Sequence, residues 1–342
     1  MNERIIAIVS GRSLNLSYPR SGEETFLQNF VKILEEMNFK VVKIELPDLL
    51  NFIKLRYIRP LQIHLVYVPF KSLILLKKAF PHSKFIYHVY YLNYATLSKY
   101  SEIQWREGLA AMGLFVDSYL ATSPMIARDL KYIVPPFRNI FLLEPYYKCN
   151  YCNLYINYKE WLSKIEELKN GILKILYIGY LNEWRFPYNA ILRGLAKLRY
   201  KVNLTVYTLD KVSEKRYSRN NISVNIISRY ITENLKCDVY RKTHFFIFLP
   251  LKNTAIIPPL TLLESVYHGA IPIVSSFVKN KIIPNMPESN VVRDFEQLPN
   301  TIESLVDAIA SQNYSFKKLL NIFYRYYDKK RFLSQLFPIL EL

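Results

Sequence analysis

Short runs of apolar residues alternate with helical patterns along the whole chain, and this alternation is the strongest constraint on its fold. In the first half, Glu23–Met37 has apolar residues at the i, i+3 and i+4 spacing of an amphipathic helix. Strands are predicted in this half at Ile5–Val9, Val41–Leu46, Leu65–Val68, Phe85–Val89 and Tyr119–Ala121. Alternating strands and helices form right-handed βαβ units, so we expect a parallel sheet.

A second series of the same kind begins after a polar helical stretch at Tyr158–Lys169. Strands are predicted at Lys174–Ile178, Asn203–Tyr207, Ser223–Ile227, Phe245–Leu249 and Pro272–Ser275, with helices at Pro187–Arg199, Thr232–Lys242 and Pro259–His268. We therefore expect an α/β protein with two Rossmann-like, doubly wound domains, residues 1–160 and 161–320, facing each other across a cleft. A helical tail at 321–342 is expected to pack back onto the first domain. Ligands of such sheets bind at the carboxyl ends of the strands.

The charge balance of the 342-residue chain points to an anionic partner. Lys and Arg number 46 against 28 Asp and Glu, a net charge of +18. Nucleic acid, a phosphorylated substrate or a membrane surface would fit this charge, and so would a generally basic surface. The motifs of P-loop proteins and of standard dinucleotide-binding enzymes do not occur. No apolar run is long enough to span a bilayer, and we expect a cytoplasmic protein.

The three cysteines are too few for a secreted disulfide framework, so a reducing compartment is expected. Cys149 and Cys152 have the C-x2-C spacing of half a zinc site or of a redox pair. Cys237 is the remaining cysteine, and no histidine is near Cys149 and Cys152 in the sequence, so four ligands cannot be completed locally. Two ordinary thiols are the alternative, and we predict no metal site.

The segment 258–276 is the most informative part of the chain. We expect a helix that starts near Thr261, carries Glu264 in its first turn and ends at Gly269, before a buried strand. This segment resembles the donor-binding motif of family 4 glycosyltransferases, E-x7-E followed by small residues, Gly, a hydrophobic residue and Pro. Glu264 matches the second Glu, which in that family holds the nucleotide ribose, whereas Ile256 occupies the position of the first Glu. The alternative is that Glu264 stabilises the helix dipole.

Two further segments of the second half resemble the same family, whose two-domain fold is called GT-B. Residues 174–185 resemble its strand followed by G-R-L-x-x-x-K: Gly179 matches the Gly, Arg185 replaces the phosphate-binding Lys, and Tyr180 stands where the family has Arg. A guanidinium can contact two phosphate oxygens at once. An exposed loop cation is the alternative for Arg185.

The resemblance also implies weaker contacts to the nucleotide. Residues 226–235 resemble the strand and loop that contact the nucleobase, which makes Arg229 and Tyr230 candidates. The start of the helix at Thr261 and Leu262 would face the diphosphate, because helix N-termini bind anions.

In the first half, residues 18–24 resemble the family's P-x-x-G-G-x-E loop, with Ser21 in place of the first Gly and Gly22 as the second. Backbone amides at Gly22 could then approach a phosphate or the donor sugar. His88 ends a strand that resembles the family strand ending in a His near the donor sugar. A core or strand-end histidine is an equally good interpretation of His88.

Together these features predict a glycosyltransferase that uses a nucleotide-diphosphate sugar as donor and a glycan, lipid or protein as acceptor. The resemblance implies retention of anomeric configuration, with no cofactor and no obligatory metal. Arg185, Glu264 and His88 are the predicted catalytic residues. A catalytically silent relative that binds nucleotide or glycan is the alternative, and a nucleic-acid-binding protein ranks last because no recognised binding module is present.

Basic and aromatic residues are interleaved in the first half, which suggests reversible contact with an anionic membrane. Isolated cations around a soluble cleft are the alternative. The residues concerned are Arg12, Arg20, Phe52, Lys54, Arg56, Tyr57, Arg59, Phe70, Lys71, Lys77, Lys78, Phe80 and Lys84.

Overall fold

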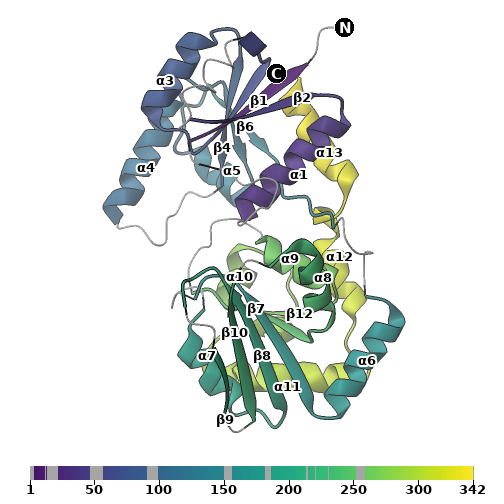
Figure 1. The fold of residues 1–342 in the computed structure, drawn as a ribbon. Helices are drawn as coiled ribbons and strands as arrows, with labels where there is room; N and C mark the ends of the chain where they lie inside the picture. The colour runs from purple at the N-terminus through teal and green to yellow at the C-terminus, as the bar shows by residue number, and fades with distance from the viewer. Residues whose placement is uncertain are drawn as a thin grey trace. The chain divides into compact units, whose positions relative to one another are not determined.

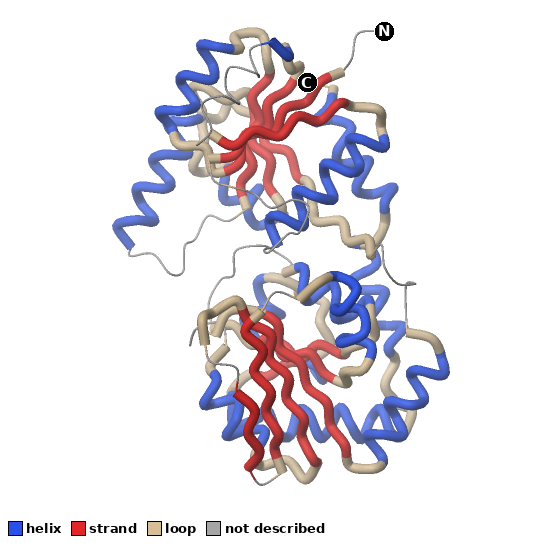
Figure 2. The backbone as a smooth tube through the Cα atoms, in the orientation of Figure 1, coloured by secondary structure: helices blue, strands red, loops and turns tan. Residues whose placement is uncertain are grey.

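The computed structural model contains two compact units. One comprises Met1–Tyr146 and Asp328–Leu342 (unit 1), and the other comprises Tyr147–Thr254 and Pro258–Tyr327 (unit 2). In each unit helices cover both faces of one sheet (Figures 1 and 2). The structure describes residues 4–11, 13, 22–46, 57–90, 99–149, 156–181, 186–212, 215–219, 221–229, 231–251 and 259–341.

The sheet of unit 1 has six parallel strands in the order β2-β1-β3-β4-β5-β6. Its strands are β1 (Ile5–Ser10), β2 (Lys40–Glu45), β3 (Gln62–Val66), β4 (Lys84–Val89), β5 (Ser118–Ala121) and β6 (Asn139–Leu142). β1 has β2 on one side and β3 on the other, so the strand order reverses there. Such a switch point is where ligands bind in open α/β sheets.

Within the described residues of unit 1, five helices pack on the two faces of this sheet. They are α1 (Gly22–Glu36), α3 (Phe70–Ala79), α4 (Lys99–Met112), α5 (Pro124–Leu130) and α13 (Lys329–Leu340). Phe26, Phe30 and Leu34 of α1 are buried, and their spacing gives the apolar stripe that the sequence predicts. Helix α5 begins where Ser123 accepts a hydrogen bond from the Ile126 amide at 3.2 Å.

The last helix of the chain belongs to the core of unit 1. Phe332 and Leu336 of α13 are buried in the same cluster as Phe30 of α1. The Gln62 side-chain amide donates to the Ile339 carbonyl at 2.8 Å, which ties α13 to β3. Helix α13 therefore covers part of one face of the unit 1 sheet.

The sheet of unit 2 has seven strands in the order β13-β12-β11-β7-β8-β10-β9, with β9 antiparallel to β10 and the other pairs parallel. These strands are β7 (Ile172–Ile178), β8 (Lys201–Thr208), β9 (Lys215–Arg219), β10 (Ile222–Ser228), β11 (Phe245–Phe248), β12 (Ile271–Ser275) and β13 (Val291–Val292). Without β9, the strands follow the Rossmann order, with the switch point between β7 and β11.

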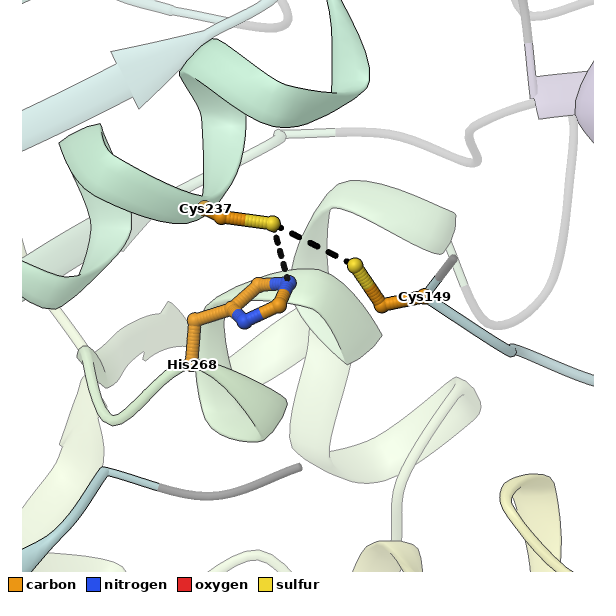
Figure 3. A group of neighbouring side chains, drawn as sticks. All are labelled: Cys149, Cys237 and His268. Carbon is orange, nitrogen blue, oxygen red and sulfur yellow. Dashed lines mark hydrogen bonds between the residues drawn. The ribbon is translucent and has the colours of Figure 1, made fainter. Parts of the chain in front are cut away.

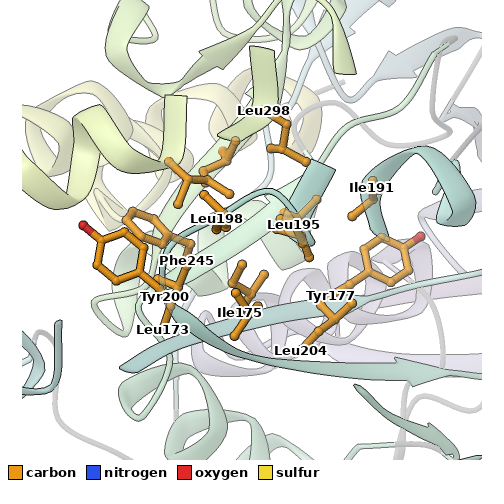
Figure 4. Packing of buried hydrophobic residues seen from close by; sticks show 14 of the residues in the cluster. Leu173, Ile175, Tyr177, Ile191, Leu195, Leu198, Tyr200, Leu204, Phe245 and Leu298 are labelled. Atoms are coloured by element: carbon orange, nitrogen blue, oxygen red, sulfur yellow. The ribbon is translucent and has the colours of Figure 1, made fainter. Parts of the chain in front are cut away.

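The core of unit 2 lies between this sheet and its helices (Figure 4). Leu173 and Ile175 of β7 belong to the same buried cluster as Ile191, Leu195 and Leu298. The helices of this unit are α6 (Tyr158–Lys169), α7 (Tyr188–Leu195), α8 (Glu233–Arg241), α9 (Leu260–Tyr267), α10 (Ser276–Lys281), α11 (Leu298–Ala310) and α12 (Phe316–Phe323). None of the helices in the described ranges is both long enough and apolar enough to cross a membrane.

Gly269 ends α9 in a conformation that favours glycine. Its φ is +81°, and a Cβ atom there would lie 2.7 Å from the Cβ of Ile156. A residue with a side chain at this position would strain the backbone and force Ile156 to move.

Candidate functional site

Several residues singled out from the sequence lie at the carboxyl edge of the unit 2 sheet. Gly179 and Tyr180 follow β7, and Arg229 follows β10 and is exposed. The helix α9, which carries Glu264, begins after β11. Since β7 and β11 flank the switch point, this edge is where the fold favours a ligand.

Glu264 is the fifth residue of α9, because the helix begins at Leu260. The prediction that it lies in the first helical turn is therefore wrong. Its side chain is 3% exposed, and its Oε1 lies 2.9 Å from the Nζ of Lys236. Its Oε2 accepts a hydrogen bond from the Tyr240 hydroxyl at 3.2 Å. A buried ion pair, rather than the helix dipole, thus balances this carboxylate.

The two partners of Glu264 come from α8. Lys236 and Tyr240 are four residues apart, so they lie on the same face of that helix. Burial raises the pKa of Tyr240 well above its usual value, and the charge of Glu264 raises it further. The hydroxyl therefore stays protonated and donates to the carboxylate. The sequence analysis missed both residues, although their four-residue spacing within a predicted helix was visible.

The first turn of α9 corrects another prediction. Leu262 is fully buried, and its amide donates to the Pro259 carbonyl at 3.0 Å. It therefore has neither a side chain nor an amide to offer a ligand. Thr261 is half-buried, and its carbonyl oxygen lies 3.1 Å from the Tyr240 hydroxyl, so it is an alternative acceptor to Glu264 for the single hydroxyl proton.

Gly179 leaves room for the side chain of Tyr177. A Cβ at this position would lie 2.7 Å from the hydroxyl oxygen of Tyr177, which donates to the Tyr180 carbonyl at 2.7 Å. The side chain of Tyr180 is 41% exposed. Arg185, which the resemblance places at the phosphates, lies outside the described residues, as do Ser21 and Tyr230.

Asp210 links three loops at the same edge of the sheet, and the sequence analysis missed it. Its carboxylate accepts hydrogen bonds from the Leu181 amide at 2.5 Å and from the Thr208 hydroxyl at 3.1 Å. Its carbonyl accepts from the Ser228 hydroxyl at 2.6 Å. Asp210 therefore connects the segment after β7 with the carboxyl ends of β8 and β10.

His88 lies in the core of unit 1. Its Nε2 is 2.8 Å from the Nδ1 of His64, and its Nδ1 is 3.3 Å from the Tyr90 hydroxyl. Its ring also meets the ring of Phe30 edge to face, with centroids 5.6 Å apart. Burial and the neighbouring His64 lower the pKa of His88 well below its usual value. Both ring nitrogens thus have partners within unit 1, which favours the core-histidine interpretation over a sugar contact. Gly22 is the first residue of α1.

Comparisons with known proteins identify the fold. Neither a protein-family model nor a curated protein sequence matches the chain. Among solved structures, sucrose-phosphate synthase from Thermosynechococcus elongatus has a TM-score of 0.71 at 11% identity, and the match covers 99% of this chain and 98% of that one. HepE from Anabaena, solved with UDP, has a TM-score of 0.62 at 10% identity, with 99% and 98% covered.

A third similar structure is an α,α-trehalose-phosphate synthase from Burkholderia vietnamiensis, with a TM-score of 0.62 at 9% identity and 99% of each chain covered. These similarities extend over nearly the whole chain. The chain is therefore an α/β protein of the GT-B fold with two Rossmann-like units, and the predicted fold class is confirmed.

Proposed function

We propose that this chain is a glycosyltransferase that uses a nucleotide-diphosphate sugar as its donor. The observation that carries the proposal is the position of Glu264, on the helix after β11, at the switch point of a Rossmann-ordered sheet. Similar structures support it: HepE from Anabaena was solved with UDP-glucose, and the sucrose-phosphate and trehalose-phosphate synthases share the fold.

The chemistry of Glu264 fits a ribose contact. Each carboxylate oxygen can accept about two hydrogen bonds. In the structure Oε1 contacts Lys236 and Oε2 contacts Tyr240. Each oxygen can therefore accept one further bond from a ribose hydroxyl, while the two protein contacts fix the orientation of the carboxylate.

The diphosphate would lie at the loop after β7 and the start of α9. A helix N-terminus favours negative charge, and it would stabilise the diphosphate more strongly as that group leaves. Arg185 would supply a positive charge at this point, as the family resemblance implies. Retention of configuration, with a diphosphate oxygen taking the acceptor proton, also rests on that resemblance. This reaction requires neither a protein base nor a catalytic metal.

A titration of the purified chain with a panel of nucleotide-diphosphate sugars tests the proposal. We expect one donor to bind and Glu264→Gln to weaken its affinity by about tenfold or more, because hydrogen bonds to a charged group contribute about 1.5–3 kcal/mol. Glu166→Gln is the matched control, since Glu166 is an exposed residue of α6 in the same unit. Absence of binding by every donor, or equal affinity of wild type and Glu264→Gln, would refute the assignment.

Release of the nucleoside diphosphate, measured with candidate acceptors, separates the two functions considered above. Turnover supports the transferase. Donor binding without turnover favours the catalytically silent relative, for which the position of Ile256 in the motif is the sequence argument.

The acceptor side carries a separate proposal, that unit 1 associates with anionic membranes. Lys71, Leu75 and Lys78 are exposed on one face of α3, at i, i+4 and i+7, and the Leu75 side chain is 60% exposed. Tyr57 is 86% exposed, and Arg59 is also exposed. Exposed cations beside apolar groups suit a lipid headgroup boundary.

Of the remaining described members of the predicted basic and aromatic set, Lys84 is exposed, whereas three others are at least partly buried. Phe80 is buried, and Phe70 packs edge to face against Phe115 with ring centroids 5.4 Å apart. Lys77 pairs with Asp117 at 3.1 Å. Arg12, Arg20, Phe52, Lys54 and Arg56 lie outside the described residues.

Co-sedimentation with phosphatidylserine vesicles at low and high salt tests this contact. Each cation near the surface adds about 1 kcal/mol, so Lys71→Glu combined with Lys78→Glu should abolish binding at low salt. Failure of the wild type to bind at low salt would leave a soluble acceptor as the better proposal.

A further inference from the structure

Three side chains with metal-binding atoms meet inside unit 2 (Figure 3). Cys237 lies on α8, His268 directly follows α9, and Cys149 lies in the segment after β6. The two Sγ atoms are 3.2 Å apart, and the Sγ of Cys237 is 3.9 Å from the Nε2 of His268. All three ligand atoms lie within 4.8 Å of one another.

These distances are close to the spacing that a tetrahedral ion imposes. Zinc binds sulfur at about 2.3 Å and imidazole nitrogen at about 2.0–2.1 Å, which separates neighbouring ligand atoms by about 3.5–3.8 Å. The observed separations lie on both sides of that range. Small side-chain rotations would therefore place all three atoms around one ion.

We propose that Cys149, Cys237 and His268 bind a zinc ion. Thiolate and imidazole together are the ligand set that zinc prefers over magnesium or calcium, which take oxygen. Cys237 is 3% exposed and His268 is fully buried, while Cys149 is partly exposed. This proposal is independent of the proposed donor and replaces the expectation that the chain has no metal site.

The sequence also offers a candidate for a fourth ligand. Cys152 follows Cys149 at the C-x2-C spacing found in many zinc sites. Cys152 lies outside the described residues. Structural zinc sites have four protein ligands, whereas catalytic sites keep one position for water.

Two further contacts of the cluster residues affect whether an ion can bind. The Tyr147 hydroxyl lies 3.1 Å from the Nε2 of His268, and it must give up this contact when the nitrogen binds the ion. Cys237 is also in a disulfide in the structure, whereas Cys149 is a free cysteine. One sulfur cannot serve a disulfide and a zinc ion together, so the reduced protein is the state to test.

The position of the cluster gives the ion a structural role. Cys237 directly follows Lys236 on α8, and the His268 amide donates to the Glu264 carbonyl at 3.0 Å on α9. An ion bound by Cys237 and His268 would therefore join the two helices that hold the Lys236–Glu264 pair.

The test is the metal content of the full chain, made without a histidine tag and purified under reducing conditions. We expect about one equivalent of zinc per chain by mass spectrometry, and a loss to below about a tenth of that in Cys237→Ser and His268→Ala. His82→Ala is the matched control, because His82 is exposed in unit 1 and should leave the zinc content unchanged. Cys152→Ser, measured in the same way, decides whether that residue is a fourth ligand: zinc is lost if it is and retained if water takes that position.

Cobalt substitution protects the test against variants that fail to fold. Co²⁺ added to the reduced, metal-free wild type should give the intense visible and thiolate charge-transfer bands of a tetrahedral site, and Cys149→Ser should weaken the charge-transfer band. Wild-type protein that binds neither zinc nor cobalt after reduction would overturn the proposal. So would a zinc content equal in wild type, Cys237→Ser and His268→Ala.

Discussion

The buried pair of Lys236 and Glu264 allows a prediction of the loss of stability on mutation, with a size worked from the structure. Lys236→Met removes the ammonium and leaves a carboxylate that is 3% exposed, with the Tyr240 hydroxyl as its remaining partner among the contacts described above. We expect unit 2 to lose about 3 kcal/mol of stability or more, because a buried charge without its partner is not solvated by water.

The distance between the two charges sets the scale of this effect. At an effective dielectric constant of about 20, unit charges separated by 2.9 Å attract each other by about 6 kcal/mol. Desolvation of both groups offsets part of this attraction, so a loss of about 3–5 kcal/mol on removing one partner is consistent with both estimates.

Urea denaturation of wild type, Lys236→Met, Glu264→Gln and the double variant measures the effect and the coupling between the two residues. The loss of stability in the double variant should be smaller than the sum of the losses in the two single variants, by about 2 kcal/mol. Each single variant leaves one buried charge without its partner, whereas the double variant leaves none.

Lys174→Met is the matched control for this experiment. Lys174 pairs with Glu167 at 2.5 Å in the same unit, but their side chains are 35% and 31% exposed. Solvent screens such a pair, so its loss should cost about 1 kcal/mol or less. A loss below about 1 kcal/mol in Lys236→Met, similar to that of Lys174→Met, would refute the reasoning from burial.

Two further predictions concern a buried histidine and a glycine. Burial lowers the pKa of His64 from 6.5 to about 3, so between these values the unfolded chain binds a proton that the folded chain does not. This residue's contribution to the free energy of unfolding should fall as the pH decreases below 6.5, by up to about 1.4 kcal/mol per pH unit. Urea titrations at several pH values would detect this fall. A free energy of unfolding that does not change with pH would contradict the assignment. Gly269→Ala should destabilise the protein more than Gly171→Ala. Both glycines have positive φ, but a Cβ at Gly171 meets open space, whereas one at Gly269 meets Ile156. Equal melting temperatures of the two variants would show that the Ile156 side chain moves aside.

The central strands could be predicted from the sequence because they are buried on both faces. Strands such as β7 and β11 are near-continuous apolar runs, the pattern of parallel strands that are covered on both faces. The strands that the sequence analysis missed lie at or beside the sheet edges. β9 has the polar sequence KRYSR, β6 is only partly buried, and β13 has two residues. β9 lacks an apolar pattern, whereas β6 and β13 are apolar but too short to show one, so pairing rather than composition defines these strands.

The boundaries of the predicted elements show a similar limit. The strand predicted at Leu65–Val68 is found at Gln62–Val66, because Tyr67 has a φ of +55° and ends the extended segment. The helix predicted at Pro187–Arg199 ends at Leu195. Such ends depend on a single backbone angle or hydrogen bond, which hydrophobic periodicity does not report.

The site was less predictable than the fold because its partners are distant in the sequence. A motif located Glu264, but the motif does not contain Lys236, which is 28 residues away. The cysteine cluster is a stronger case. Cys149 and Cys237 are 88 residues apart and Cys237 and His268 are 31 apart, so local spacing could not complete a ligand set that the sheet topology brings together.

A buried lysine shows that the packing around the predicted donor site, as well as its motif, positions Glu264. The Lys164 ammonium on α6 donates to the carbonyls of Thr243 at 2.6 Å and Gly269 at 2.7 Å, and to that of Tyr240 at 3.4 Å. These carbonyls lie at the carboxyl ends of α8 and α9, where side-chain donors often satisfy the last carbonyl groups of a helix, and burial lowers the pKa of Lys164 to about 7. Lys164 thus joins the ends of the two helices, and the Lys236–Glu264 pair joins them further along. Lys164→Met would therefore remove contacts to both of the helices that carry the Lys236–Glu264 pair.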